Sequence, residues 1–412
     1  MQLDPDTLVE IRAQFPALSR QAGGKTAVYL DGPAGSQVPQ SVIRAISDCL
    51  AKHNANHGGE FPTSRESDQA MKNAHEAVAD FLGADDPACI HFGANMTSLT
   101  FAFSRALART WDNGDEVVVT HLDHDGNHTP WKLAARDAGV TVRNVGINPA
   151  DCTLDMDDLA SRLSGRTRLV AVTAASNLSG SLTPVKEISR MAHEAGAEVF
   201  VDAVHYAPHR AIDVRDWDCD YLVCSAYKFF GPHVGILWGQ RERMEAIEPY
   251  KLRTSPENLP GRWMTGTQNH EGIHGVKAAV DYLASVAGES PTRREGILAS
   301  MDSIRAHEAK LSKCFLDGLA TLEGYELVGI ADTGRLDERV PTFSLRHPTL
   351  PSRELARKLG DAGIFTWHGN FYALPVTEFL GHEPDGLLRA GFLHYNTEAE
   401  VDRLLEELGQ WL

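Results

Sequence analysis

The amino-acid sequence predicts an α/β protein with a large domain, built on a mostly parallel seven-stranded sheet, and a smaller α+β C-terminal domain. The chain has 412 residues, which is too long for one ordinary core and fits two domains. Between about residues 85 and 240, short apolar runs alternate with amphipathic helical stretches, as in a βαβ sheet. After Glu271 the pattern changes to two long helices separated by a polar break, and then to short strands and helices.

Each predicted element follows from its local pattern. The seven apolar runs predict strands at residues 90–92, 116–120, 140–145, 168–174, 198–202, 220–224 and 234–238. A helix is predicted at residues 185–195, because it begins just after Pro184 and stops at Gly196. We expect the large domain to span residues 26–285 and the small domain residues 286–412, with residues 1–25 associated with the small domain.

Composition narrows the classes of function. Hydrophobic residues make up 42% of the chain and the formal net charge is −17. Without a stripe of Lys or Arg, this charge disfavours binding to nucleic acid or to an anionic membrane. No run of about 20 apolar residues is present and the first residues do not resemble a signal peptide, so we expect a cytoplasmic protein.

The cysteines do not form a recognisable site. Six are scattered along the chain without a CxxC pair, unlike a disulfide framework or a zinc site. We expect reduced, mostly buried thiols at Cys49, Cys89, Cys152, Cys219, Cys224 and Cys314.

Polar residues stand just beyond two neighbouring strands, where α/β sheets bind ligands. Asp202 ends one strand and His205 follows it, while Ser225 and Lys228 follow the next strand. A helix cap and a solvated lysine are the structural alternative, which the aromatic context SAYKFFGP disfavours. A carboxylate beside a pyridine nitrogen and a desolvated lysine able to form a Schiff base are what pyridoxal 5'-phosphate (PLP) chemistry requires. The sequence therefore predicts a PLP enzyme with Lys228 as the cofactor lysine.

A phosphate site is predicted at the start of a helix. The segment FGANMTSLTFAFSRAL places Met96 and Thr97 at a helix N-terminus, where backbone N–H groups bind anions, and Ser225 adds a hydroxyl. An ordinary N-cap at Asn95 or Thr97 explains the same segment equally well. The chain has neither a GxGxxG nor a GxxxxGK[ST] motif, so dinucleotide and Walker-type sites have no support.

Two further loops carry candidate cofactor residues. His124 follows the strand at 116–120 and is suited to stacking on a flat heteroaromatic ring. Asn177 follows the strand at 168–174 and is suited to donating to a phenolic oxygen. A metal held by His121, His124 and His128 is the disfavoured alternative, because a loop with Gly and Pro does not hold them on one helical face.

At this point the chain resembles a known family. DGPAGSQVP, LDHDGNHTPW, SNLSGSLTPV, VDAVH, SAYKFFGP, TGTQN and LLRAGFLHYNT, in this order, are similar to the class V aminotransferase family, in its cysteine-desulfurase-like branch. The resemblance runs from about residue 28 to the C-terminus. It implies a PLP enzyme of fold type I that is an obligate homodimer with active sites at the subunit interface.

The resemblance also implies roles for single residues. Lys228 matches the Schiff-base lysine, Asp202 the partner of the pyridine nitrogen, and His124 the ring-stacking histidine, which can also move protons. Thr97 and Ser225 match phosphate-binding positions, and Asn177 matches a residue near the phenolic oxygen. Thr267 matches a hydroxyl that reaches the phosphate of the neighbouring subunit. Arg389 matches the arginine that binds the substrate α-carboxylate, a task for which a planar fork is suited.

Three positions depart from the pattern of the family. In TWHGNFYALP, Tyr372 occupies the place of the cysteine that attacks sulfur in desulfurases, so the usual persulfide route has no nucleophile. His205 stands where glutamine is common near the cofactor oxygen, and Tyr227 stands where a histidine often precedes the lysine. Both replacements keep a hydrogen-bonding group.

We therefore expect an enzyme that acts at Cα of an amino acid or a related primary amine by aminotransferase or β-lyase chemistry. An epimerase or racemase, and a catalytically idle PLP-fold binding protein, are the alternatives. Besides Arg389, the expected substrate-binding residues are Tyr372, Asn370 and His57, for which packing at a dimer interface is the equally weighted alternative.

Overall fold

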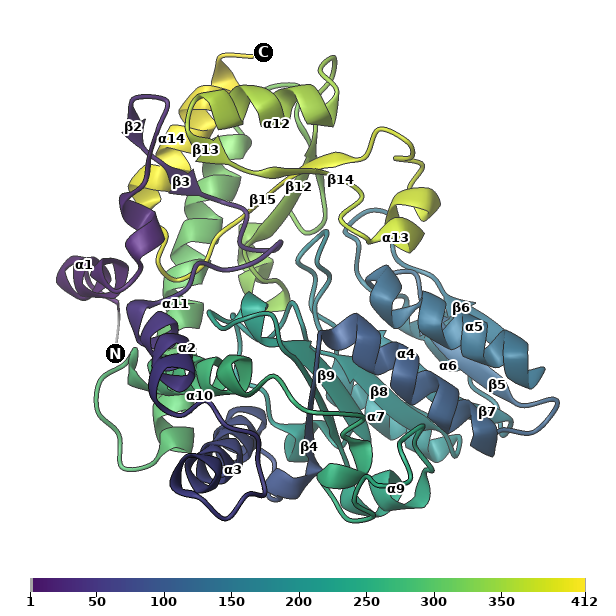
Figure 1. Cartoon of the computed structure of the whole chain (residues 1–412). Helices are drawn as coiled ribbons and strands as arrows, with labels where there is room; N and C mark the ends of the chain where they lie inside the picture. Colours follow the sequence, from purple (N-terminus) through teal and green to yellow (C-terminus); the bar gives the residue numbers. More distant parts are fainter. Residues whose placement is uncertain (1–2, 412) are drawn as a thin grey trace.

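The computed structural model describes residues 3–411 and has a seven-stranded sheet in its lower part (Figure 1). The order of its strands is β4-β10-β9-β8-β7-β5-β6, in which β10 alone runs antiparallel to its neighbours β4 and β9. The seven predicted strands and the mostly parallel sheet are confirmed, as is the α/β class. The strands are β4 (Ile90–Gly93), β5 (Glu116–Thr120), β6 (Thr141–Val145), β7 (Thr167–Thr173), β8 (Glu198–Asp202), β9 (Tyr221–Ser225) and β10 (Gly235–Gly239).

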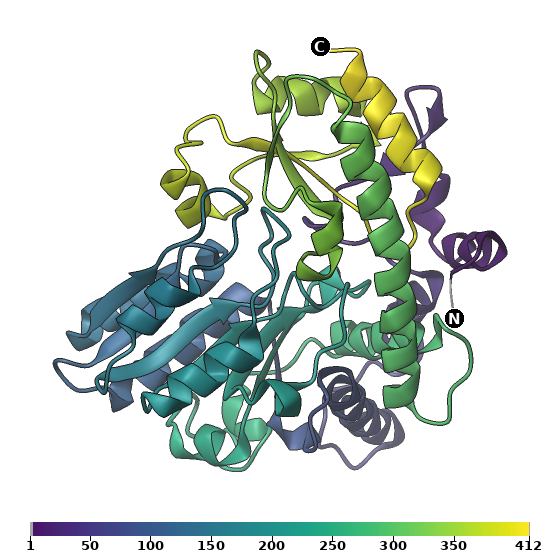
Figure 2. The same ribbon diagram turned by 180° about the vertical axis from the view of Figure 1, so that it is seen from behind.

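Helices cover both faces of this sheet. Helices α4 (Met96–Leu107) and α5 (Thr129–Ala138) lie in front of it in Figure 1, and α7 (Val185–Glu194) lies on the opposite face, which Figure 2 shows. The helix predicted at 185–195 is therefore present, and Gly196 follows it in the left-handed conformation, with φ at +84°. The shorter helices of this part are α6 (Met156–Arg162), α8 (Val214–Trp217) and α9 (Arg241–Ala246).

A second group of helices leads to the C-terminal part. Helix α10 (His270–Ser285) packs against α2 (Gln40–Lys52) and α3 (Pro62–Leu82), and α11 (Arg293–Leu319) runs from them to the upper sheet. Its N-terminus carries a capping box between Thr292 and Glu295. The first half of α11 contributes to the core of the large sheet and the second half to a separate core. The long helix thus ties the two cores together.

The C-terminal part is built on a four-stranded antiparallel sheet in the order β11-β12-β15-β14. Its strands are β11 (Glu326–Val328), β12 (Thr342–Arg346), β14 (Trp367–Gly369) and β15 (Leu387–Gly391), and its helices are α12 (Ser352–Asp361), α13 (Leu374–Phe379) and α14 (Glu398–Gly409).

The N-terminal segment contacts both cores. It forms α1 (Pro5–Ala13), the hairpin β1 (Gln21–Ala22) and β2 (Lys25–Thr26), and β3 (Val28–Tyr29), which pairs in parallel with β13 (Ile364–Phe365). Arg12 forms an ion pair of 2.9 Å with Glu400 of α14, while Phe15 belongs to the core of the large sheet. The proposed domain limits at 26–285 and 286–412 stay a prediction. Within residues 3–411, no helix is both long and apolar enough to cross a membrane.

Candidate active site

A cavity of about 670 Å³ lies beyond the carboxyl ends of the parallel strands, and Lys228 and Asp202 share its wall. Such a place is the ordinary ligand site of α/β sheets. Eight predicted cofactor residues meet here. They are Met96, Thr97, His124, Asn177, Asp202, His205, Ser225 and Lys228.

Lys228 lies in a short 3-10 turn directly after β9, and its side chain is almost fully buried. Its Nζ donates a hydrogen bond to the carbonyl oxygen of Pro33. Burial, helped by the positive charge of Arg389, lowers the pKa of Lys228 to about 7, against the opposing effects of Asp202 and Asp31. Near neutral pH about half of this amine is unprotonated, compared with on the order of one in a few thousand for an ordinary lysine. An unprotonated amine is the form that attacks a carbonyl carbon.

Asp202 is the last residue of β8 and is fully enclosed. One carboxylate oxygen, Oδ1, accepts from the backbone N–H of Val204 at 2.8 Å, and Oδ2 accepts no hydrogen bond from residues 3–411. Burial raises the pKa of Asp202 to about 7, although Val204 and Lys228 oppose the shift. A buried carboxyl group with a spare oxygen on a cavity wall fits the protonated ring nitrogen of PLP.

The imidazole of His124 is oriented by the backbone. Its Nδ1 accepts from the N–H of Gly126 at 2.9 Å, which leaves the proton of the neutral ring on Nε2. Burial, with smaller effects of Lys228 and Arg389, lowers the pKa of His124 to about 4, so the ring is neutral. A Cβ atom at Gly126 would come within 2.9 Å of both His124 Nδ1 and Thr97 Oγ1. Only glycine therefore leaves room for these side chains against the cavity.

The N-terminus of α4 lies at the cavity and is held by β9. The N–H of Met96 donates to Ser225 Oγ at 3.0 Å, and the Asn95 side chain caps the helix by accepting from the N–H of Ser98 at 2.8 Å. The structure therefore contains both features that were considered for this segment, namely an N-cap at Asn95 and a hydroxyl group beside the start of the helix. The positive end of the helix dipole, with the hydroxyl groups of Ser225 and Thr97 beside it on the cavity wall, suits a phosphate group.

Arg389 reaches the same region from β15 of the C-terminal sheet. Its guanidinium donates to the carbonyl oxygen of Asn177 at 2.8 Å and lies 4.3 Å from the centre of the Phe371 ring. Burial lowers the pKa of Arg389 to about 9, against the effect of Asp31. Among residues 3–411, no carboxylate oxygen lies within 4.0 Å of this guanidinium. The side chain of Asn177 donates to Phe371 O at 2.9 Å, and its Oδ1 is buried without a partner.

A second buried arginine shows that this lack of partners is specific to Arg389. Arg339 is also enclosed, but its N–H groups donate to the backbone carbonyls of four residues, Ser179, Ile330, Val340 and Thr342. Those bonds satisfy the guanidinium locally. Arg389 makes a single hydrogen bond within the described chain and keeps donors for an external anion.

Tyr372 and Asn370 lie in the loop after β14, next to the cavity. The Tyr372 ring is 73% exposed and its centre lies 5.6 Å from that of His124. The backbone of Tyr372 accepts from the N–H of Asp125 at 2.6 Å and donates to Asn370 Oδ1 at 3.2 Å. The Asn370 amide donates to Glu383 at 3.1 Å. Asn370 thus shapes the loop, while the phenol of Tyr372 is free to meet a ligand.

Two predicted residues lie away from Lys228 within this chain. His57 lines a separate, mostly apolar cavity of about 360 Å³, together with Gln268 and the buried His75. Thr267 is exposed and precedes Gln268 in the chain. The roles predicted for His57 and Thr267 stay predictions, although Gln268, the chain neighbour of Thr267, lines the same cavity as His57.

The cavity also contains Tyr227, which the sequence marked only as a departure from the family pattern, and two residues that the sequence did not single out, His233 and Phe101. Tyr227 and His233 stack at 5.0 Å with an angle of 15° between their rings, and both line the cavity with Phe101. Phe101 stands one helical turn after Thr97 on α4, and this spacing was the available signal. Asp31 is a further missed residue, and burial raises its pKa to about 6 against the effects of Arg389 and Lys228.

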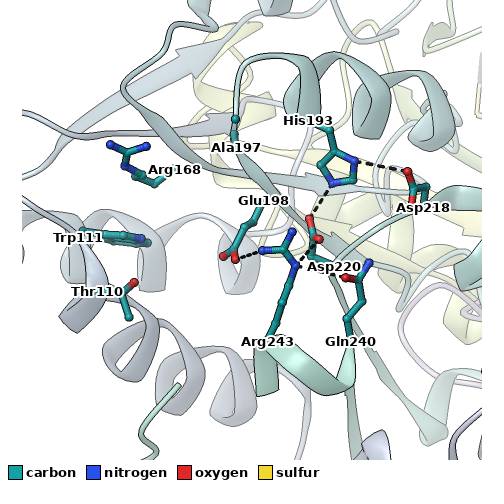
Figure 3. A pocket seen from close by; sticks show the side chains of 11 residues that line it. Thr110, Trp111, Arg168, His193, Ala197, Glu198, Asp218, Asp220, Gln240 and Arg243 are labelled. Atoms are coloured by element: carbon teal, nitrogen blue, oxygen red, sulfur yellow. Dashed lines mark hydrogen bonds and ion pairs between the residues drawn. The ribbon is translucent and has the colours of Figure 1, made fainter. Parts of the chain in front are cut away.

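A different hollow, of about 470 Å³, lies at the amino edge of the sheet, opposite Lys228 (Figure 3). Its charged side chains pair with one another. The buried Asp220 contacts Arg243 at 2.6 Å and His193 at 3.0 Å, and Arg243 also contacts Glu198. Arg168, which also lines the hollow, pairs with Asp115 at 3.0 Å, so both arginines of the lining already have a carboxylate partner.

The three loop histidines do not converge on one point. His121 packs against Phe379 with 5.2 Å between the ring centres, and His128 bonds to Asn144 at 3.1 Å. In the described part of the chain, no group of three or more His, Cys, Asp or Glu side chains is arranged to hold a metal ion.

Comparisons with known proteins agree with this site. The profile of the aminotransferase class V family matches residues 28–404. A cysteine desulfurase from Enterobacter sp. (strain 638) is 31% identical, and the alignment covers 97% of each chain. A probable cysteine desulfurase from Halobacterium salinarum is 32% identical over 97% of this chain and 95% of its own length.

Solved structures give the same result. The apo cysteine desulfurase of Thermococcus onnurineus NA1 superimposes with a TM-score of 0.87 at 26% identity, over 98% of this chain and 97% of that one. A cysteine desulfurase of Escherichia coli gives 0.84 at 25% identity, over 98% of both chains. The predicted family, cofactor and fold type are thus confirmed. The chain belongs to the aminotransferase class V family and is a PLP-dependent enzyme of fold type I.

Proposed function

We propose that the chain acts at Cα of an amino acid, or of a related primary amine, by aminotransferase or β-lyase chemistry. The observation that carries this proposal is the pair formed by Lys228, a buried lysine with a strongly lowered pKa, and Asp202, a buried carboxyl group with a spare oxygen on the same cavity wall. A buried lysine and a buried carboxyl group with purely structural roles would not need to share the wall of one cavity. Perturbed titration of both partners at one cavity is typical of catalysis.

The residues present fit PLP. Lys228 would hold its carbonyl carbon, Asp202 its ring nitrogen, and His124 one face of its ring. The N-terminus of α4 with Thr97 and Ser225 would hold its phosphate. When bound, PLP withdraws electrons from bonds to the substrate Cα and so makes loss of the α-proton possible.

Lys228 and Arg389 would divide the work on the substrate. Once a substrate amine has replaced it, the freed amine of Lys228 is the group placed to take the proton from Cα, because its lowered pKa leaves it unprotonated near neutral pH. The spare donors of Arg389 would orient an α-carboxylate, and its stacking on Phe371 fixes the plane of the fork.

We further propose that the enzyme does not form a persulfide on the loop at Tyr372. No cysteine occurs in residues 366–375, and five of the six cysteines are buried elsewhere. Desolvation raises the pKa of Cys152, Cys219 and Cys224, so none of them is an activated nucleophile. Without an activated cysteine, the expected outcome is either release of a sulfur-containing group directly to solvent or exchange of the amino group.

A cytoplasmic homodimer with shared active sites completes the proposal. Exposed apolar side chains on α2 and at the start of α3 support a subunit contact, namely Ile43, Leu50 and Phe61. His57 and Thr267 lie away from Lys228 of their own chain, and a partner subunit is the place where they would act. Sedimentation of wild-type and Thr267→Ala protein, with the PLP affinity of each, tests this arrangement.

One experiment separates the chemical outcomes. Purified enzyme with PLP is incubated with amino acids that carry sulfur or other leaving groups at Cβ, with and without a keto acid as amino acceptor. Keto acid, ammonia and sulfide are measured separately. A β-lyase releases keto acid and ammonia together without an acceptor, whereas an aminotransferase releases keto acid only with an acceptor and no ammonia. Loss of optical activity without any product would indicate an epimerase, and sulfide formation that depends on a cysteine of this chain would refute the proposal.

A further inference from the structure

We propose that Thr342 is a positioning residue that fixes the proton of His205 on Nδ1, so that the ring presents an N–H donor to the PLP cavity. The proposal about the tautomer concerns the protein alone. Only its consequence for the cofactor rests on the proposed function.

The contact joins the two sheets. His205 follows β8 and lines the cavity, and Thr342 is the first residue of β12 in the C-terminal sheet. His205 Nε2 and Thr342 Oγ1 are 2.8 Å apart, and both side chains are buried. The two residues are 137 positions apart in the chain.

The direction of this hydrogen bond follows from the acceptors that are available to the hydroxyl proton of Thr342. Thr342 has no exposed surface, and His205 Nε2 is the only hydrogen-bond partner of its hydroxyl in residues 3–411. If Nε2 donated its proton to Thr342, the proton of the hydroxyl would be buried without an acceptor, which is costly. Thr342 therefore donates and Nε2 accepts. In a neutral imidazole the proton then lies on Nδ1.

The ring of His205 is neutral because of its surroundings. Burial is the largest cause that lowers its pKa, and the neighbouring groups His209, Lys228, Arg389 and His124 add to the shift. The ring centre of His209 lies 5.3 Å from that of His205, and His209 Nδ1 is hydrogen-bonded to the buried carboxylate of Glu308 at 3.0 Å. No carboxylate of the described chain bonds directly to His205. Protonation of both ring nitrogens is thus disfavoured.

The remaining N–H lies on the cavity side. His205 Nδ1 has no hydrogen-bond partner in residues 3–411, and the residue stands three positions after Asp202 on the same wall. A fixed N–H donor there suits an anionic oxygen of a bound ligand. Thr342, a residue of β12 in the C-terminal sheet, would thus influence the charge distribution of the bound cofactor.

Neighbouring contacts show that β12 is well placed for this task. Ser344, two residues along β12 and on the same face, donates to Leu178 O at 2.7 Å. Ser344 provides a matched control, because its side chain also bonds to a residue outside the C-terminal sheet but does not contact His205.

The first test uses the protein without PLP. Selective ¹⁵N labelling of histidine shows which ring nitrogen carries the proton, and the His205→Leu spectrum identifies the signal of His205. The expected result is an Nδ1–H tautomer in wild type. An Nε2–H tautomer or a protonated ring at neutral pH would overturn the proposal, whatever the enzyme catalyses.

The second test uses the holoenzyme and follows the visible absorbance band of bound PLP as a function of pH. Thr342→Val removes the hydrogen bond that anchors the His205 ring through Nε2, so the Nδ1–H donor is held less firmly against an anionic oxygen. That oxygen then holds a nearby proton more strongly, and the pH midpoint of the band should rise by about one unit. Thr342→Ser should restore the wild-type midpoint and Ser344→Ala should leave it unchanged. The double variant His205→Leu/Thr342→Val should equal His205→Leu alone.

Additive shifts in the double variant, or an unchanged midpoint in Thr342→Val, would refute the role of Thr342. If Thr342→Val does not fold, the tautomer of His205 in the wild-type protein still tests the proposal. Absence of any PLP band in wild type would instead contradict the proposed function.

Discussion

Replacing Asp202 by asparagine should stabilise the PLP-free protein at pH 8 much more than at pH 5. Burial raises the pKa of Asp202 to about 7, whereas an unfolded aspartate titrates near 3.9. The folded state therefore holds this proton more tightly than the unfolded state. The contribution of Asp202 to stability is complete below about pH 4 and is lost as the pH rises to about 7.

The magnitude follows from the width of that window. A difference of about three pKa units corresponds to about 4 kcal/mol of unfolding free energy at pH 7 and above, and about two of these units lie above pH 5. Asparagine keeps the shape of the side chain and carries no charge at any pH. The stability of Asp202→Asn relative to wild type should therefore increase by about 3 kcal/mol between pH 5 and pH 8.

Urea unfolding of both PLP-free proteins at pH 5, 6, 7 and 8, followed by tryptophan fluorescence, measures this difference. Adding PLP should reverse the order at pH 8, because only the aspartate offers a carboxylate to a protonated ring nitrogen. A stability difference that does not change with pH would refute the reasoning, since it would mean that Asp202 does not titrate in this window.

Asp220→Asn is the matched control. Asp220 is as deeply buried as Asp202, but Arg243 and His193 already pair with it (Figure 3). Its replacement leaves those partners without an anion and should destabilise the protein by about 1–3 kcal/mol at both pH values. A pH-dependent stabilisation here would show that burial alone, and not the empty partner position of Asp202, causes the effect.

Three further outcomes are expected. Lys228→Ala should abolish the visible absorbance band of bound PLP and turnover while circular dichroism stays unchanged, and wild-type turnover would remove Lys228 from the mechanism. Arg389→Lys should raise KM for amino acids by about 30- to 100-fold, because a bidentate charge-assisted contact is lost, but not for amines without a carboxylate; equal effects on both would contradict the role of Arg389. Tyr372→Phe should leave the PLP dissociation constant within about twofold of wild type and change KM or kcat, and a large loss of PLP affinity would refute its placement toward substrate.

The sequence predicted those parts of the structure that depend on local pattern. The apolar runs that end at Asp202 and just before Ser225 are strands, and Lys228 follows the second of them as expected. The reversed direction of β10 was not predicted, because hydrophobic periodicity identifies a strand without giving its direction. The connection from β9 to β10, at residues 226–234, is too short for a parallel crossover.

Contacts made by the fold of the whole chain lay beyond the sequence. Nothing near Thr342 indicates that it meets His205. Asp31 opens the motif DGPAGSQVP, but that motif does not indicate that its carboxyl group influences Lys228 and Arg389. The role of Arg389 came from the resemblance alone. Its lack of a carboxylate partner became visible only when the loops that surround it were placed.

The backbone of the loop at Tyr372 gives an independent reason to assign it a function. Phe371 and Tyr372 both adopt left-handed conformations, with φ at +58° for each, which costs about 1–3 kcal/mol per residue for side chains other than glycine. Two hydrogen bonds from loops that follow strands of the seven-stranded sheet hold this segment, from Asn177 to Phe371 O and from Asp125 to Tyr372 O. A pair of glycines would adopt the same backbone without that cost. The two side chains must therefore contribute something that the backbone does not: Phe371 supports the guanidinium of Arg389, and Tyr372 is left as the exposed group beside His124.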